Sequence, residues 1–232
     1  MHKRAPAELT AKDVADFLSY LAVERHVARS TQNQAFNALL FVFRHVLDKD
    51  LGQLGSAVRA GVRRRLPMVL TVPEVERIFA HLDGVHQLMA MLIYGGGLRL
   101  MECLRLRVKD VDLERGTVTV RAGKGDKDRQ TLLPERIKPA LLAQLERVRA
   151  VYQEDRKNGV PGVELPDALA RKYPHAGEEW CWHWLFAAAG LSVDPRSKTV
   201  RRHHVMPEWL QRQFKAAVAK KNVLGVKSPL DG

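Results

Sequence analysis

The sequence has little cysteine and no long hydrophobic run. Cys103 and Cys181 are its two cysteines among 232 residues, so one disulfide at most could form and a reducing, cytoplasmic compartment is expected. The longest apolar stretch, residues 88–98, is interrupted by glycines and is well short of the roughly 20 residues that cross a bilayer. No basic-then-apolar leader follows Met1, so we expect no secretory signal and no membrane partner.

Acidic residues are scarce relative to basic ones. The chain has 38 Lys and Arg against 26 Asp and Glu, a formal net charge of +12, and a hydrophobic fraction of 46% that is ordinary for a folded protein. The basic residues cluster at 59–65, 99–109, 121–138 and 196–221. Each cluster alone could be a solvated surface, but together they favour a polyanionic partner. Nucleic acid is therefore the first partner to consider.

Hydrophobic periodicity predicts a mostly helical chain with one small sheet. Helices are expected from Thr10 to about Arg25, after Thr31, from Thr71 to Leu82, and over 86–95, 98–106, 134–155 and 207–221. Alternating apolar residues at 111–113, 118–120 and 130–133 predict a three-stranded antiparallel meander. Residues 52–66 are typical of a linker, and 159–197 are expected to be irregular and rich in aromatic residues.

Glycine-rich and histidine-rich stretches give no sign of a cofactor site. The triplet at 95–97 follows a helix, and no Ser or Thr follows Lys124, so neither stretch fits a phosphate-loop or dinucleotide pattern. Cys181, His183 and the pair at 203–204 do not form a recognisable metal-ligand set. We therefore predict no metal and no nucleotide cofactor.

Two basic residues stand where they could act on a phosphodiester. Arg99 follows a glycine-rich helix break and could point its guanidinium at a phosphate, whereas Lys124 lies in a predicted β-turn and could protonate a leaving oxygen. The alternatives are an ion pair between Arg99 and Glu102 and a solvated turn lysine.

Several motifs in order resemble the tyrosine recombinases. They are GLRLME (97–102), LRVKDVD (106–112) and GKGDKDR (123–129). Further motifs look like the extra segment of integron integrases: LPDAL (165–169), RKYP (171–174), WCWHW (180–184), DPRS (194–197) and RRHH (201–204). The resemblance covers nearly the whole chain.

The resemblance implies a fold and a domain organisation. The expected fold is mostly α with a small three-stranded antiparallel sheet, a helical core-binding domain followed by a truncated α+β catalytic domain. A partial SAM-like core-binding domain would occupy residues 1–55, a linker 56–68 and the catalytic domain 69–232. Within the last, 158–205 would be the integron-specific segment.

The resemblance also implies site roles. Family members cleave one DNA strand through a phosphotyrosine link and need no cofactor. By resemblance, Arg99 matches the first phosphate-binding arginine of the family. Glu102 matches the glutamate that supports this arginine, and Lys124 matches the lysine of the strand turn. Protruding bases of a folded single-stranded recombination site would stack in the extra segment, on aromatic and imidazole rings. The expected DNA-binding residues are Trp182, Pro195, Arg201, Arg202, His203, His204, Lys127 and Arg129. Alternatively, the tryptophans belong to the core.

The family's second arginine box and nucleophilic tyrosine are not found in this sequence. Its four tyrosines are Tyr20, Tyr94, Tyr152 and Tyr173, and the stretch 222–231 looks like the family's extreme C-terminus. We therefore expect an internal deletion and a bacterial, cytoplasmic protein that is inactive in strand cleavage alone. One alternative is a non-enzymatic protein that binds duplex or folded recombination sites, either as a homo-oligomer or together with an intact integrase. A second alternative is a remnant that does not fold stably.

Overall fold

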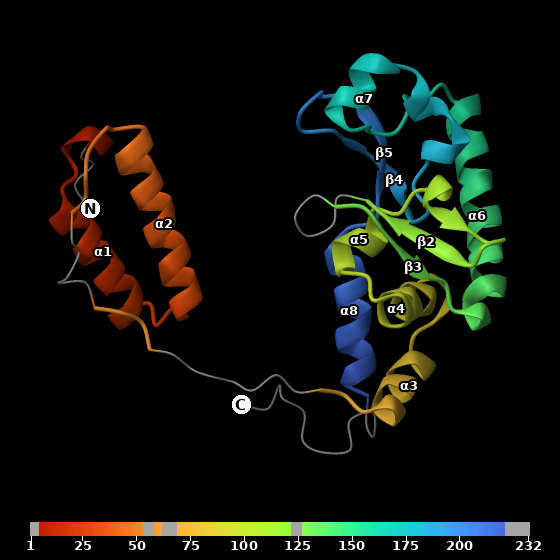
Figure 1. The fold of residues 1–232 in the computed structure, drawn as a ribbon, viewed down its shortest axis with the longest axis horizontal. Coiled ribbons are helices and arrows are strands. Elements are labelled where there is room, and N and C mark those ends of the chain that lie inside the picture. Colours follow the sequence, from red (N-terminus) through yellow and green to blue (C-terminus); the bar gives the residue numbers. More distant parts are fainter. Residues whose placement is uncertain (1–4, 53–57, 62–68, 122–126, 221–232) are drawn as a thin grey trace. The chain divides into compact units, whose positions relative to one another are not determined.

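The computed structural model describes residues 5–52, 58–61, 69–121 and 127–220, which fall into two compact units, Met1–Val69 and Leu70–Gly232 (Figure 1). Among these residues, no helix is both long and apolar enough to span a bilayer.

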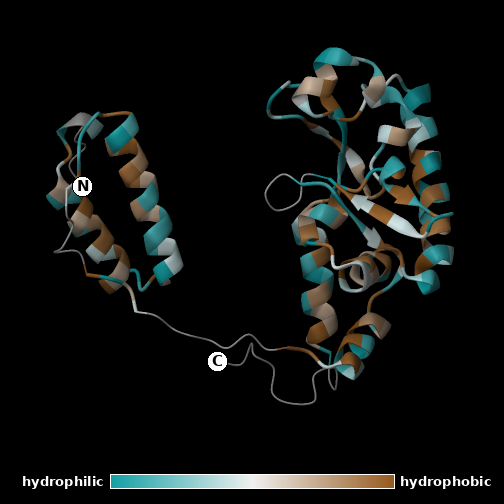
Figure 2. Ribbon diagram, viewed as in Figure 1, coloured by the Kyte–Doolittle hydropathy of each residue, from teal (hydrophilic) through white to brown (hydrophobic). Residues whose placement is uncertain are grey.

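The first unit is built on two amphipathic helices, α1 (Ala11–Val23) and α2 (Arg29–His45), preceded by the short 3-10 helix η1 (Pro6–Glu8). Thr10 caps α1 as predicted, since its backbone N–H donates to Asp13 Oδ2 at 2.8 Å. The helix α2 begins at Arg29, slightly before the predicted start. Figure 2 shows hydrophobic and hydrophilic residues on both helices; Val14, Leu18 and Phe43 form their shared core with Leu51.

Part of the expected linker belongs to this first unit. The buried Gln32 side chain donates to the carbonyl oxygens of Leu18 and Val58 at 2.8 and 2.7 Å, and it accepts the Ala60 N–H at 2.9 Å. Residues 58–61 are therefore held against α1 and α2, because a buried amide side chain must satisfy its polar atoms.

The second unit combines helices with a three-stranded sheet. Its first elements are α3 (Val72–Ala80), α4 (Gly84–Gly96), α5 (Leu100–Leu104), η2 (Val108–Asp110), β1 (Val111–Asp112), β2 (Thr117–Val120), β3 (Arg129–Leu132), η3 (Glu135–Ile137) and α6 (Lys138–Lys157). The strands pair antiparallel in the order β1-β2-β3, which confirms the predicted meander. Figure 1 shows α6 running alongside this sheet. The core between them includes Val118, Val120 and Leu141.

The turn between α4 and α5 depends on glycine. Gly97 ends α4 in the left-handed conformation, with φ +61°, which glycine adopts without the steric penalty of a Cβ. The chain then starts α5 with Arg99 at the N-cap position. The predicted helix over 98–106 is therefore shorter than expected, and its first turn carries Arg99 and Glu102.

Residues 158–205, which were expected to form the extra segment, are more regular than expected. They contain α7 (Asp167–Lys172), η4 (Ala176–Glu178), η5 (Trp180–Trp182) and a hairpin of β4 (Ala187–Val193) and β5 (Val200–His204), followed by α8 (Pro207–Val218). The prediction that 159–197 is irregular was wrong for α7 and for β4. This strand lacks alternating apolar residues and pairs with β5 alone, with a register shift between Ala187 and Leu191. The mostly helical fold class is confirmed, with this second, two-stranded sheet added.

Candidate nucleic-acid interface

Glu102 joins two arginines at the start of α5. Its Oε1 lies 2.6 Å from Arg99 Nη1 and 3.0 Å from Arg129 Nη1, and its Oε2 accepts from Arg129 Nη2 at 2.7 Å and from the Arg99 backbone N–H at 2.8 Å. The hydrogen bond from Arg129 is the largest cause that lowers the pKa of Glu102 to about 2. The carboxylate is therefore ionised throughout the neutral range.

The predicted alternative for Arg99, an ion pair with Glu102, is present, yet the arginine remains accessible. The Arg99 side chain is 57% exposed, whereas the Glu102 side chain is 9% exposed. Arg99, Lys127 and Arg129 line a basic pocket of about 550 Å³ beside Gly97. The predicted proton donor Lys124 lies outside the described residues.

A larger groove of about 680 Å³ extends from Arg99 to residues of α7 and of the tryptophan-rich stretch 180–184. Its walls come from α5, the segment 105–110, β2, α7 and the tryptophan-rich turn. The basic side chains that line it are Arg99, Arg105, Arg107, Lys109 and Arg121. Trp182 lines the same groove. The phosphate-binding arginine and the base-stacking tryptophan were expected at separate sites, but here they share one cavity.

Arg107 is a central residue of this groove that the sequence analysis did not single out. Its guanidinium carbon lies 3.9 Å from the Trp184 ring centroid, and its Nη1 and Nη2 donate to the carbonyl oxygens of Trp182 and Glu164 at 2.7 and 2.8 Å. Burial lowers the pKa of Arg107 to about 10, which leaves it charged at neutral pH. The sequence feature that includes Arg107 is the basic LRVKDVD motif (106–112). This motif does not indicate that the arginine packs on a tryptophan.

The tryptophans of WCWHW lie in three different environments. Trp184 is buried, as the core alternative proposed, whereas Trp182 is half-buried and has Lys109 Nζ 2.8 Å from its ring centroid. Trp180 packs against Tyr152, with ring centroids 5.3 Å apart, and does not line the groove. Among the described residues, Trp182 is therefore the tryptophan best placed to contact a ligand in this cavity.

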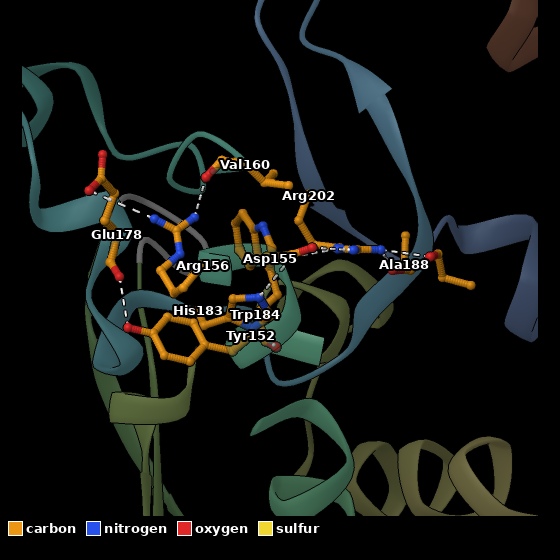
Figure 3. A network of polar contacts seen from close by, with 10 residues as sticks. Tyr152, Asp155, Arg156, Val160, Glu178, His183, Trp184, Ala188 and Arg202 are labelled. Carbon is orange, nitrogen blue, oxygen red and sulfur yellow. Dashed lines mark hydrogen bonds and ion pairs between the residues drawn. The ribbon is translucent and has the colours of Figure 1, made fainter. Parts of the chain in front are cut away.

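Arg202, which was expected to contact DNA, is engaged inside the protein. Its Nε donates to Asp155 Oδ2 at 2.8 Å, its Nη2 pairs with Asp155 Oδ1, and its Nη1 donates to the carbonyl oxygens of Ala188 and Ala189 (Figure 3). His183 Nε2 lies 4.0 Å from the same Asp155 carboxylate. The guanidinium therefore joins α6 to the hairpin and does not point into the groove.

The other predicted residues of the hairpin are divided between its surface and its interior. Pro195 is exposed in the turn, and Arg201 Nε lies 3.7 Å from Asp194 Oδ2. His203 is half-buried against Trp184, with ring centroids 5.7 Å apart. His204 is buried, its Nδ1 lies 2.7 Å from the Val205 carbonyl oxygen, and burial lowers its pKa to about 4. In the described part of the chain, no group of three or more His, Cys, Asp and Glu side chains is placed to hold a metal.

Comparison with known families gives two matches along the chain. The model described as "Phage integrase family" matches residues 68–228, and the one described as "Phage integrase, N-terminal SAM-like domain" matches residues 1–53.

Individual relatives are integrases and recombinases. The chain is 50% identical over 226 residues to proteins named "Integrase/recombinase" from Escherichia coli and Pseudomonas aeruginosa, matching 97% of this chain and 67% of theirs. It is 36% identical to "Tyrosine recombinase XerA" from Thermococcus kodakarensis, over 60% of this chain and 49% of that protein.

Solved structures give weaker similarity. The crystal structure of XerA recombinase aligns with a TM-score of 0.41 and 21% identity, covering 94% of this chain and 65% of XerA. The XerH recombinase bound to its difH substrate aligns with a TM-score of 0.44 and 25% identity, over 60% of this chain and 43% of XerH. The chain thus spans about two thirds or less of the length of these relatives.

Proposed function

The chain belongs to the phage integrase family, the tyrosine recombinases of site-specific DNA recombination, and from that membership we propose that its basic groove binds DNA recombination sites. The observation that carries this proposal is the placement of Arg99 and Trp182 in one cavity. A guanidinium binds a phosphate through charge-assisted hydrogen bonds, and an indole stacks on a base of any sequence. A nucleotide whose base leaves its helix offers both groups to one groove.

The preferred ligand is folded single-stranded DNA with a protruding base, as in the integron branch. Arg99 contacts a phosphate at one end of the groove and Lys127 contacts another in the pocket beside Gly97, while Trp182 receives the base. His203 and Pro195 extend the base-binding surface along the hairpin, and Arg201 contributes positive charge there. Arg202 and His204 support this surface from inside, because their polar groups are already paired within the protein.

The test compares two DNA hairpins that differ by one unpaired base protruding from the stem. The full chain is expected to bind the bulged hairpin more tightly, by about 5-fold to about 150-fold, since one stacked base contributes about 1–3 kcal/mol. Trp182→Ala should lose this preference, whereas the matched control Trp180→Ala should keep it. Affinity should also fall steeply with salt, because bound phosphates release counterions. Equal affinity for both hairpins, insensitive to salt, contradicts the proposal.

We further propose that the 232-residue chain does not cleave DNA by itself. Three of its tyrosines lie outside the groove in defined settings: Tyr152 donates its hydroxyl to the Glu178 carbonyl at 2.9 Å, Tyr94 packs on Phe79, and Tyr20 lies in α1. The fourth, Tyr173, is exposed beyond the end of α7. A cleaving recombinase would leave a covalent protein–DNA adduct on a nicked suicide substrate. We expect none on a denaturing gel; an adduct that survives denaturation would show that the chain is an active enzyme.

A further inference from the structure

Arg129 lines the pocket beside Gly97, but its guanidinium is engaged by groups of the protein. It is the first residue of β3, two positions after Lys127. Its Nη2 lies 2.7 Å from Glu102 Oε2 and 3.2 Å from the Gly97 carbonyl oxygen, and its Nη1 lies 3.0 Å from Glu102 Oε1. Two parallel bonds from one guanidinium to one carboxylate fix the plane of both groups.

Two connections lead from Arg129 to Arg99. In the first, the carboxylate that Arg129 orients receives the Arg99 backbone N–H on Oε2 and the Arg99 Nη1 on Oε1. In the second, the bond to the Gly97 carbonyl holds the left-handed turn that comes just before Arg99. Both the backbone and the side chain of Arg99 therefore depend on contacts that Arg129 makes.

The charges of this cluster also separate the roles of the two arginines. Arg99, Arg129 and Glu102 together carry a net charge of +1. The Arg129 guanidinium bonds both carboxylate oxygens, at 2.7 and 3.0 Å, whereas the Arg99 guanidinium bonds one of them, at 2.6 Å. Arg99 is the more exposed of the pair, at 57% against 36%. The positive charge that remains for a ligand is thus presented by Arg99, while Arg129 neutralises Glu102.

We propose that Arg129 is a positioning residue, which acts through Glu102 and Gly97 to hold Arg99 in its phosphate-binding geometry, and makes no phosphate contact of its own. This inference rests on the proposed function, in which Arg99 binds a DNA phosphate. It also connects the start of β3 with the N-cap of α5, where Arg99 lies.

The test is a double-mutant cycle in DNA affinity measured over a range of salt concentrations. Each phosphate contact contributes about 0.9 to the slope of log affinity against log salt on duplex DNA. Arg99→Gln should lower the slope by about one contact, Arg129→Gln should lower it equally, and the double variant should lower it no further. The matched control is Lys127→Gln, an exposed residue of the same pocket. The decrease in slope caused by Lys127→Gln should add to the decrease caused by Arg99→Gln.

A conservative variant separates positioning from direct contact. Arg129→Lys keeps the charge but cannot bond both Glu102 oxygens and the Gly97 carbonyl with one rigid fork. It should therefore behave like Arg129→Gln, with the Arg99 contribution lost. An Arg129→Lys protein with the wild-type slope, or an additive double variant, would overturn the inference. So would an Arg129→Gln protein that loses thermal stability but keeps the full slope, because that result describes a purely structural residue.

Failure of the inference and failure of the proposed function are distinguishable in this experiment. A wild-type chain without salt-dependent affinity for the hairpins refutes DNA binding itself. A wild-type chain that binds normally, with independent effects of Arg99→Gln and Arg129→Gln, refutes the positioning role alone.

Discussion

Arg202 and Asp155 form an ion pair that joins β5 to the C-terminal end of α6. Both side chains are largely buried, at 11% and 5% exposed. The same guanidinium donates to the carbonyl oxygens of Ala188 and Ala189, at 3.0 and 2.6 Å, within the stretch where the register of β4 shifts against β5. One side chain therefore bonds a buried carboxylate and two carbonyls of an irregular strand, and it holds the hairpin that carries His203.

Removing the charge of Asp155 is expected to destabilise the protein strongly. Asp155→Ala leaves the Arg202 guanidinium buried without its counterion, and breaking a buried pair in this way costs about 3–5 kcal/mol. The free energy of unfolding, measured by urea titration, should fall by that amount. The matched control is Glu135→Gln, which breaks an ion pair whose acid is 81% exposed and should cost less than about 1 kcal/mol. Equal losses in the two variants would show that burial does not matter here.

Arg107 is expected to resist even a conservative replacement. Arg107→Lys keeps the charge but cannot stack a planar group on Trp184 while donating to the carbonyls of both Trp182 and Glu164. Because hydrogen bonds from charged groups contribute about 1.5–3 kcal/mol each, we expect a loss of about 2 kcal/mol in the free energy of unfolding. Arg105→Lys, at an exposed position of the same loop, should change it little. An Arg107→Lys protein as stable as Arg105→Lys would contradict a structural role for the buried guanidinium.

The elements that could be predicted from the sequence are those with local causes. The start of α1 at Thr10 and of α3 at Thr71 follow from a hydroxyl residue and an acid three positions later, and both caps form as expected. The three-stranded meander follows from alternation and intervening turns. The hairpin strand β4 was missed because its apolar residues do not alternate, and it is held instead by pairing with β5 and by Arg202.

The candidate site could be predicted only in part, because its decisive contacts are distant in the chain. The sequence pointed to Arg99, Glu102 and Trp182, but gave no signal that Arg129 bonds Glu102 or that Arg107 stacks on Trp184. Such pairings depend on how α5, β3 and residues 164–184 pack together, and periodicity carries no information on that packing. For the same reason the motif alone did not distinguish the buried Trp184 from the half-buried Trp182, although both line the groove.

Gly97 is expected to tolerate a side chain less well than its open surroundings imply. A Cβ at this position would meet no atom within 4 Å, but φ is +61°, and the left-handed conformation costs other residues about 1–2 kcal/mol. Gly97→Ala should therefore lower the free energy of unfolding by about 1 kcal/mol and weaken DNA binding, since the turn places Arg99. Gly190→Ala is the matched control, because that site is equally open and has no positive φ. If Gly190→Ala lowered the free energy of unfolding as much as Gly97→Ala, the positive φ of Gly97 would not explain the effect.

His204 is expected to make the folded protein sensitive to acid. Burial lowers its pKa to about 4 from an ordinary value of 6.5, so between these values the unfolded chain binds a proton that the folded chain does not. Stability contributed by this residue is therefore complete above pH 6.5 and declines as the pH falls through 4, by at most about 1.4 kcal/mol per pH unit and about 3 kcal/mol in total.

The measurement is the free energy of unfolding in urea at several pH values between 7 and 4.5, for the wild type and for His204→Phe. Phenylalanine keeps a ring in the buried site but does not titrate, so the variant should lose less stability on acidification than the wild type, even though it lacks the bond to the Val205 carbonyl. His86 and His183 also have pKa values lowered by burial and act in the same direction in both proteins, so the difference between the two slopes isolates His204. Identical slopes would show that His204 is protonated equally in the folded and unfolded chains, and that its burial has no part in the acid response.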